Sequence, residues 1–279
     1  MPHNTIAQNT FVDVINMTSE LDLGLPLEYQ IMPEWFDAHN IKADTNDKNA
    51  SLRKILSFHG IKTVLDMTCG TGSQVFDLSE HGFDVTGSDF SPKLLDIARE
   101  KSIALGKDIS FISGDMRNIQ IGKFDAVITM FNAIGHVSKQ DFSKAIGNIR
   151  SNLNPGGLYV FDIFNLDAMS DDAIKSLEVV QEKEAGGARF HQHQISQIDH
   201  QKGLMISTDR YDIHWQDGRQ DGQHEQRENT FTLQIYTADE LKDLLLQNGF
   251  ELISQTALDG SEFIKEKSLE ILTVAKKLS

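Results

Sequence analysis

LDMTCGTGSQ, residues 65–74, is an apolar run that ends on an acid and continues into two glycines. Glycine-rich turns after buried strands usually bind phosphate groups. Here Val75 stands in place of the third glycine of a dinucleotide-binding G-x-G-x-x-G sequence, and the Gly-Lys-Ser/Thr of a P-loop is missing. A carboxylate at Asp66 about 4 Å from a pyrophosphate oxygen would cost several kcal/mol at an intermediate dielectric constant. The stretch therefore favours a nucleotide-like ligand that carries an ammonium or sulfonium group.

Strands and helices alternate on both sides of this stretch. Buried strands are predicted at 62–67, 84–89, 109–115, 124–131 and 157–164. Helices are predicted from Asp47 to Gly60 and at 72–82, 91–106 and 139–153. Ser91 is a typical N-cap residue, and Pro92 suits the first helical position. This alternation indicates βαβ units and a parallel, doubly wound sheet.

The pattern changes after Asn165. Stretches with a two-residue period at 190–199, 204–215 and 229–236 predict antiparallel strands. A helix with a capping box from Thr237 to Glu240 follows, and the last strands are predicted at 251–258 and 268–277. We therefore expect an α/β fold in which a mostly parallel seven-stranded sheet carries a small antiparallel flap inserted after its fifth strand.

Polar residues stand at the carboxyl ends of successive predicted strands, where open α/β sheets bind ligands. Asp89 follows Gly72 by 17 residues, the usual interval for an acid that accepts both hydroxyls of a ribose. Asp115 ends the third strand and is placed to accept from an adenine amino group. The fourth strand brings Met130 to the same edge. Together with the acid before the glycines, these positions predict S-adenosylmethionine as the ligand.

These motifs resemble those of the class I S-adenosylmethionine-dependent methyltransferases, over residues 51–164 and 236–279. The matching segments are VLDMTCGTG (64–72), VTGSDFSPKLLDIARE (85–100), ISFISGDM (109–116), FDAVITMFNAIGHV (124–137) and IRSNLNPGGLYVFDIF (149–164). The resemblance implies a Rossmann-like methyltransferase fold that uses S-adenosylmethionine as cofactor. It implies three parts: a lead-in over the cofactor site at 1–46, a core at 47–165 and 236–279, and an antiparallel substrate lid at 166–235.

The resemblance also implies roles for individual residues. The loop around the methionine portion would consist of Asp66, Thr68, Gly70 and Gly72. Asp89 would hold the ribose hydroxyls, and Phe90 would lie against adenine. Asp115 and Met116 would bind the adenine edge. Thr68 departs from the family pattern, since glycine or alanine is more frequent at that position.

The end of the fourth strand, FNAIGH at 131–136, lacks the Asn/Asp-Pro-Pro-aromatic sequence of enzymes that methylate base amines. It resembles the corresponding stretch of glycine or sarcosine N-methyltransferases and amino-sugar N,N-dimethyltransferases, which also carry a small flap. We therefore predict methyl transfer to a small molecule, most directly to an amine. O-methylation of a small hydroxyl or carboxyl compound remains an alternative, as does a non-catalytic protein that binds S-adenosylmethionine.

Candidate catalytic and substrate residues follow from these positions. His136 is predicted to accept a proton from the nucleophile or to orient it, against a histidine satisfied by the backbone. Asn132 is predicted to hydrogen-bond cofactor or substrate, against a role as a turn residue. Substrate contacts are predicted for Tyr29, Arg210, Tyr211 and Trp215, for which ordinary packing is the alternative.

Composition narrows the classes of partner and compartment. The formal net charge of −15 disfavours nucleic acid as a substrate. Cys69 is the single cysteine, so no internal disulfide forms, and a reducing cytoplasm is expected. No run of about 18 apolar residues occurs, so no membrane association is expected. His191 and His193 share one strand face without an evident third ligand, so we predict no metal site.

Overall fold

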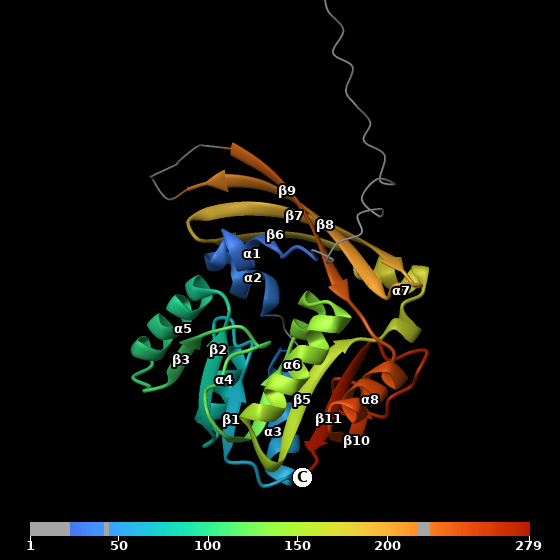
Figure 1. Ribbon diagram of the computed structural model, residues 1–279. Helices are drawn as coiled ribbons and strands as arrows, with labels where there is room; N and C mark the ends of the chain where they lie inside the picture. The colour runs from blue at the N-terminus through green and yellow to red at the C-terminus, as the bar shows by residue number, and fades with distance from the viewer. Residues whose placement is uncertain (1–22, 42–44, 217–223) are drawn as a thin grey trace, which may run out of the picture.

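The computed structural model describes residues 23–41, 45–216 and 224–279, which form two sheets (Figure 1). The larger sheet has seven strands in the order β10-β11-β5-β4-β1-β2-β3, and the smaller has four in the order β6-β7-β8-β9. The seven-stranded sheet with an antiparallel insertion after its fifth strand is therefore confirmed.

The larger sheet is parallel except at one edge. Its parallel strands are β1 (Thr63–Asp66), β2 (Asp84–Asp89), β3 (Ser110–Ser113), β4 (Phe124–Thr129) and β5 (Leu153–Phe164). β10 (Phe250–Thr256) and β11 (Glu270–Lys277) complete the edge in antiparallel pairing. The strand order reverses between β1 and β4, and open α/β sheets bind ligands at such a point.

Helices cover both faces of this sheet. They are α3 (Thr45–Phe58), α4 (Ser73–Glu80), α5 (Pro92–Ala104), α6 (Lys139–Asn152) and α8 (Ala238–Gln247). One face packs α3, α4 and α5 on an apolar cluster that includes Leu56, Leu78 and Leu95, and the other packs α6 and α8 on a second cluster. Ser91 caps α5, and Thr237 and Glu240 form a reciprocal capping box on α8, both as predicted. Among the helices that the structure describes, none has the length and apolar character needed to span a bilayer.

The smaller sheet is an antiparallel meander that follows the short helix α7 (Asp171–Ser176). Its strands are β6 (Val179–Ala185), β7 (Ala188–Asp199), β8 (Leu204–Trp215) and β9 (His224–Gln234). All four lie within the predicted insertion, but β6 was not predicted. No residue of this edge strand is fully buried, so its sequence VVQEKEA lacks the apolar alternation of a strand that covers a core.

Short N-terminal helices lie between the two sheets (Figure 1). They are α1 (Leu27–Gln30), η2 (Pro33–Trp35) and α2 (Phe36–Asn40). Trp35 is fully buried and stacks on Phe190 of β7, with 4.3 Å between the ring centroids. Tyr211 of β8 lies in the same apolar cluster. The smaller sheet therefore contacts the N-terminal helices through aromatic packing.

Candidate active site

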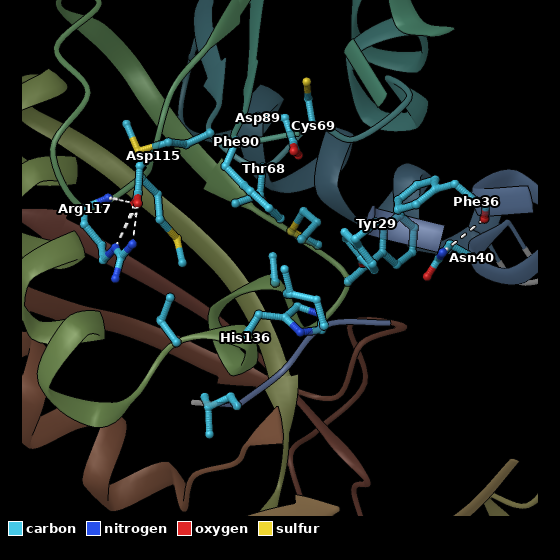
Figure 2. A pocket seen from close by; sticks show the side chains of 18 of the residues that line it. Tyr29, Phe36, Asn40, Thr68, Cys69, Asp89, Phe90, Asp115, Arg117 and His136 are labelled. Carbon is cyan, nitrogen blue, oxygen red and sulfur yellow. Dashed lines mark hydrogen bonds and ion pairs between the residues drawn. The ribbon is translucent and has the colours of Figure 1, made fainter. Parts of the chain in front are cut away.

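A cavity of about 450 Å³ lies where β1, β2 and β4 end, between the larger sheet and the N-terminal helices (Figure 2). The predicted site residues that line it are Tyr29, Thr68, Asp89, Phe90, Asp115, Met116, Met130 and His136. Sequence reasoning missed Phe36 and Asn40, which line it from α2. No local pattern signals these two, because only the packing of the N-terminal helices brings them to the strand ends.

The glycine turn after β1 shapes the cavity floor through its backbone. Gly70 and Gly72 have φ values of +53° and +94°, a region that favours glycine. A Cβ on Gly70 would lie 2.8 Å from the ring of Phe36. The Gly70 N–H donates to Oδ2 of Asp89 at 2.9 Å. Neither glycine lines the cavity. Gly70, which has no side chain, leaves room for the Phe36 ring, and its N–H connects the turn to the end of β2.

This close approach gives a testable expectation for Gly70→Ala. The left-handed backbone costs an alanine about 1 kcal/mol, and the added methyl must also displace the Phe36 ring. Gly106→Ala is the matched control, since Gly106 has φ +64° and no heavy atom within 4 Å of an added Cβ. We expect urea unfolding to show a larger loss of stability for Gly70→Ala, and equal losses would contradict the contact with Phe36.

Asp66 is buried beneath the turn and does not line the cavity. Its Oδ1 accepts from the Thr68 N–H at 3.2 Å, and its Oδ2 has no hydrogen-bond partner. Burial raises the pKa of Asp66 to about 8, so the carboxyl is largely protonated at neutral pH. The predicted charged acid facing the ligand is therefore not what the structure shows: Asp66 is buried and protonated, and the residues that follow it, Met67 to Cys69, line the cavity instead.

Asp89 lines the cavity at the end of β2. Its Oδ1 accepts from the Ser91 N–H at 2.8 Å, and its Oδ2 accepts from Gly70. Burial raises the pKa of Asp89 to about 6, against the effect of these backbone donors, so the carboxylate is mostly ionised at neutral pH. The adjacent Phe90 is 46% exposed as a residue and lines the cavity, which leaves apolar surface available to a flat ligand.

Asp115 and Arg117 lie at the end of the cavity away from Phe36 and Asn40, just after the strand that pairs with the end of β2 (Figure 2). The Arg117 guanidinium lies 2.6 Å from Oδ2 of Asp115 and 2.8 Å from Oδ2 of Asp141. Although burial raises the pKa of Asp115, hydrogen bonds from Arg117 outweigh it and hold this pKa below its usual value. Arg117 lies two residues after a predicted site residue, but sequence reasoning did not single it out. Its charge is matched by two carboxylates.

The turn after β4 has an unusual backbone. Phe131 and Asn132 have φ values of 60° and 57°, which non-glycine residues rarely adopt. Their N–H groups donate to Asp162 of β5 at 2.7 and 3.3 Å. Burial raises the pKa of Asp162 to about 7. This buried carboxyl, which sequence reasoning missed, holds the turn from which the short helix η3 (Ala133–His136) begins.

Asn132 and His136 are separated by this turn. The side chain of Asn132 is directed to Glu270, with Nδ2 3.5 Å from Oε1, and does not line the cavity. His136 does line it, 5.2 Å from the Tyr29 ring centroid, and its Nδ1 is buried without a hydrogen-bond partner. Burial lowers the pKa of His136 to about 4, so the ring is neutral at neutral pH. It is therefore a poor proton acceptor but a good hydrogen-bond acceptor.

The three predicted substrate residues of β8 lie outside the cavity. Arg210 is on the exposed face of the sheet and pairs with Glu228 at 2.8 Å. Tyr211 is buried against Trp35 and accepts a hydrogen bond from Gln192, and Trp215 also packs near Trp35. These three residues do not reach the cavity as predicted, because the N-terminal helices lie between the smaller sheet and the cavity. Tyr29 is the predicted substrate residue that the structure does bring to the cavity.

Comparisons with known proteins agree with this geometry. Residues 64–157 match a family described as Methyltransferase domain. The chain is 29% identical to the putative methyltransferase YqeM of Bacillus subtilis, over 70% of this chain and 75% of that protein. It is 31% identical to a glycine/sarcosine N-methyltransferase of Aphanothece halophytica, over 51% of this chain and 56% of that protein. The sugar N-methyltransferase KedS8 from Streptoalloteichus shares the fold, with a TM-score of 0.73 at 18% identity over the whole of both chains.

Proposed function

We propose that this chain is an S-adenosylmethionine-dependent methyltransferase that methylates the nitrogen atom of a small amine. The observation that carries the proposal is the neutral His136 ring in the cavity wall, with its unpartnered Nδ1. Such a ring accepts a hydrogen bond from the N–H of an unprotonated amine. The similarity to a glycine/sarcosine N-methyltransferase and a sugar N-methyltransferase supports the same reaction class.

The lining residues fit S-adenosylmethionine, which when bound supplies a methyl group made electrophilic by the sulfonium. Asp89 offers an ionised carboxylate for two ribose hydroxyls, and Phe90 offers an exposed ring for adenine. Thr68 Oγ1 is buried without a partner, as expected of a polar atom that a ligand satisfies. We assign Asp115 and Met116 to the adenine edge. Asp66 supports the turn from below rather than contacting the cofactor.

The remaining wall residues position the acceptor and keep it neutral. Tyr29 and Phe36 contact each other edge to face, with 5.1 Å between centroids, and present apolar surface to the cavity. Beside His136 this apolar wall, which lacks a carboxylate of its own, disfavours an ammonium ion, so the amine binds there in the form whose lone pair is free. His136 then orients that lone pair by accepting the N–H. In this proposal the described residues of the segment 166–235 support the N-terminal cover of the cavity and do not touch the acceptor themselves.

The charged side chains that line the cavity limit which classes of methyl acceptor can bind. Within the described lining the positively charged side chain is Arg117, and two carboxylates already bind it. His136 is neutral, and Asp89 and Asp141 add negative charge. The cofactor already brings one carboxylate into this lining, so an acceptor with its own carboxylate or phosphate would add a second anion that is desolvated here without a free cationic partner. We infer that the acceptor is an amine that carries no acidic group, in contrast to glycine.

A screen for S-adenosylhomocysteine production tests this function. The compounds would be alkyl and aromatic amines, amino sugars without phosphate, amino acids, and hydroxyl compounds of matched size. We expect turnover with the uncharged or basic amines. A highest kcat/KM for amino acids would contradict the charge argument, and turnover of hydroxyl compounds alone would replace N-methylation by O-methylation. Calorimetric titration with S-adenosylmethionine checks cofactor binding separately.

Cofactor affinity should depend on pH through Asp89. The ionised form of this carboxylate accepts the ribose hydroxyls, so below its pKa of about 6 binding must first remove a proton. The dissociation constant for S-adenosylmethionine should therefore rise by up to about tenfold per pH unit below that value. Asp89→Asn, which does not titrate, should abolish this part of the slope. An unchanged slope in Asp89→Asn would assign the titration to another group.

A further inference from the structure

The exposed face of the smaller sheet carries a cluster of metal-ligating side chains at its end farthest along β8. Asp212 and His214 are two residues apart on β8 and share one face, because side chains alternate along a strand. His224 of β9 lies directly opposite His214 in the strand register. The neighbouring Tyr211 and Ile213 are buried on the other face, against the N-terminal helices. The cluster therefore faces away from the methyl-transfer cavity.

The three side chains converge at ligand distances. Nε2 of His224 lies 2.5 Å from Oδ1 of Asp212, and Nε2 of His214 lies 3.3 Å from the same oxygen. One ligand atom from each residue lies within 4.8 Å of the other two. In a tetrahedral zinc site, bonds of about 2.0–2.1 Å place the ligand atoms about 3.4 Å apart. Small changes of side-chain rotamer are enough to bring the three ligand atoms of Asp212, His214 and His224 to that separation.

The paired strands β7, β8 and β9 fix the positions of Asp212, His214 and His224. They also bring a third histidine to the same face. The imidazole rings of His214 and His224 are stacked, with 4.7 Å between centroids. His191 of β7 lies opposite Asp212 in register and is also exposed. The sequence pair His191 and His193 is not itself a site, because His193 is hydrogen-bonded to Glu178 at 2.6 Å. The ligands of the candidate site come instead from β8 and β9, and their distance apart in the sequence gives no sign that they lie together.

We propose that Asp212, His214 and His224 form a binding site for Zn²⁺, with His191 or water as the fourth ligand. Two imidazole nitrogens and one carboxylate oxygen are the donor set of zinc and related transition metals, whereas Ca²⁺ and Mg²⁺ require oxygen ligands. Bound zinc joins the facing strands β8 and β9 at their last described pair. It stabilises the sheet that supports the N-terminal cover, and it takes no part in methyl transfer.

Calorimetric titration of the metal-stripped, untagged chain with ZnCl₂ tests the proposal. We expect one equivalent to bind, with affinity lowered at least tenfold in His214→Ala, His224→Ala and the near-isosteric Asp212→Asn. His200→Ala is the control, since His200 is exposed on the turn before β8, outside the cluster. Titration with MgCl₂ should give no binding at this site.

Two outcomes would overturn the zinc site. One is the absence of stoichiometric zinc binding by the metal-stripped chain. The other is binding that persists unchanged in Asp212→Asn and in His214→Ala, with circular dichroism showing that both variants fold. Zinc should also raise the melting temperature of the unmodified chain and of His200→Ala, but not that of His224→Ala. This pattern is independent of any acceptor, so it distinguishes the metal site from the proposed methyl transfer.

Discussion

His136→Phe is expected to lower kcat for methylation about a hundredfold, because the acceptor loses the group that orients its lone pair. Phenylalanine fills the same wall beside Tyr29, so the cavity keeps its shape and apolar character. Steady-state kinetics with the acceptor from the screen would give kcat and KM separately. The dissociation constant for S-adenosylmethionine should change little, since Asp89 and Phe90 form the other end of the site.

His136→Gln provides the conservative comparison, because its amide oxygen also accepts a hydrogen bond. We expect it to recover part of the lost rate. Because the pKa of His136 is about 4, this ring should not titrate near pH 6.5. The kcat of the unmodified enzyme should therefore show no inflection near pH 6.5 that depends on His136. Full activity of His136→Phe would remove His136 from the mechanism, and an inflection lost in that variant would make it a general base.

Asp89→Ala is expected to weaken S-adenosylmethionine binding by about 30-fold, or about 2 kcal/mol, through loss of charge-assisted hydrogen bonds to the ribose. The change also removes the acceptor of the Gly70 and Ser91 N–H groups, so part of the loss comes from a looser turn. Calorimetric titration measures the affinity directly. Unaltered affinity would show that the ribose assignment is wrong.

Asp115→Ala is the comparison for this variant. Asp115 also lines the cavity, but it is paired with Arg117, so its removal leaves that guanidinium with Asp141 alone and does not affect the acceptor of the ribose hydroxyls. Titration with 2′-deoxy and 3′-deoxy analogues of the cofactor separates the two roles. The analogues should lose affinity in the unmodified chain and in Asp115→Ala, but lose little more in Asp89→Ala.

Features set by short segments of sequence were predictable. The caps at Ser91 and Thr237 depend on hydrogen bonds within four residues, and both occur as predicted. The central parallel strands β1, β4 and β5 are largely buried, so their apolar runs are visible in the sequence. Asp89 and Asp115 reach the cavity because the carboxyl ends of neighbouring parallel strands meet at one edge. Local pattern and sheet geometry were sufficient for these.

Features set by packing between distant segments were not predictable. Asn132 was placed in the site by its position in the chain, but the left-handed turn directs its side chain toward Glu270. The role of Tyr211 as a packing residue depends on Trp35, which lies far away in sequence. The cluster of Asp212, His214 and His224 depends on the register between β8 and β9. The sequence alone does not specify this register, because it does not show at which residues the two strands end and begin.

The stacking of Trp35 on Phe190 has a consequence for how enzymes of this kind diverge. The cofactor end of the cavity is made by strand ends of the core, whereas Tyr29 and Phe36 belong to short helices held in place by the smaller sheet. Mutations in that sheet can therefore reshape the acceptor end without touching a cofactor contact. We expect related chains to keep the strand ends while the sheet and the helices beneath it drift together, so that new acceptors arise from changes that never enter the cavity.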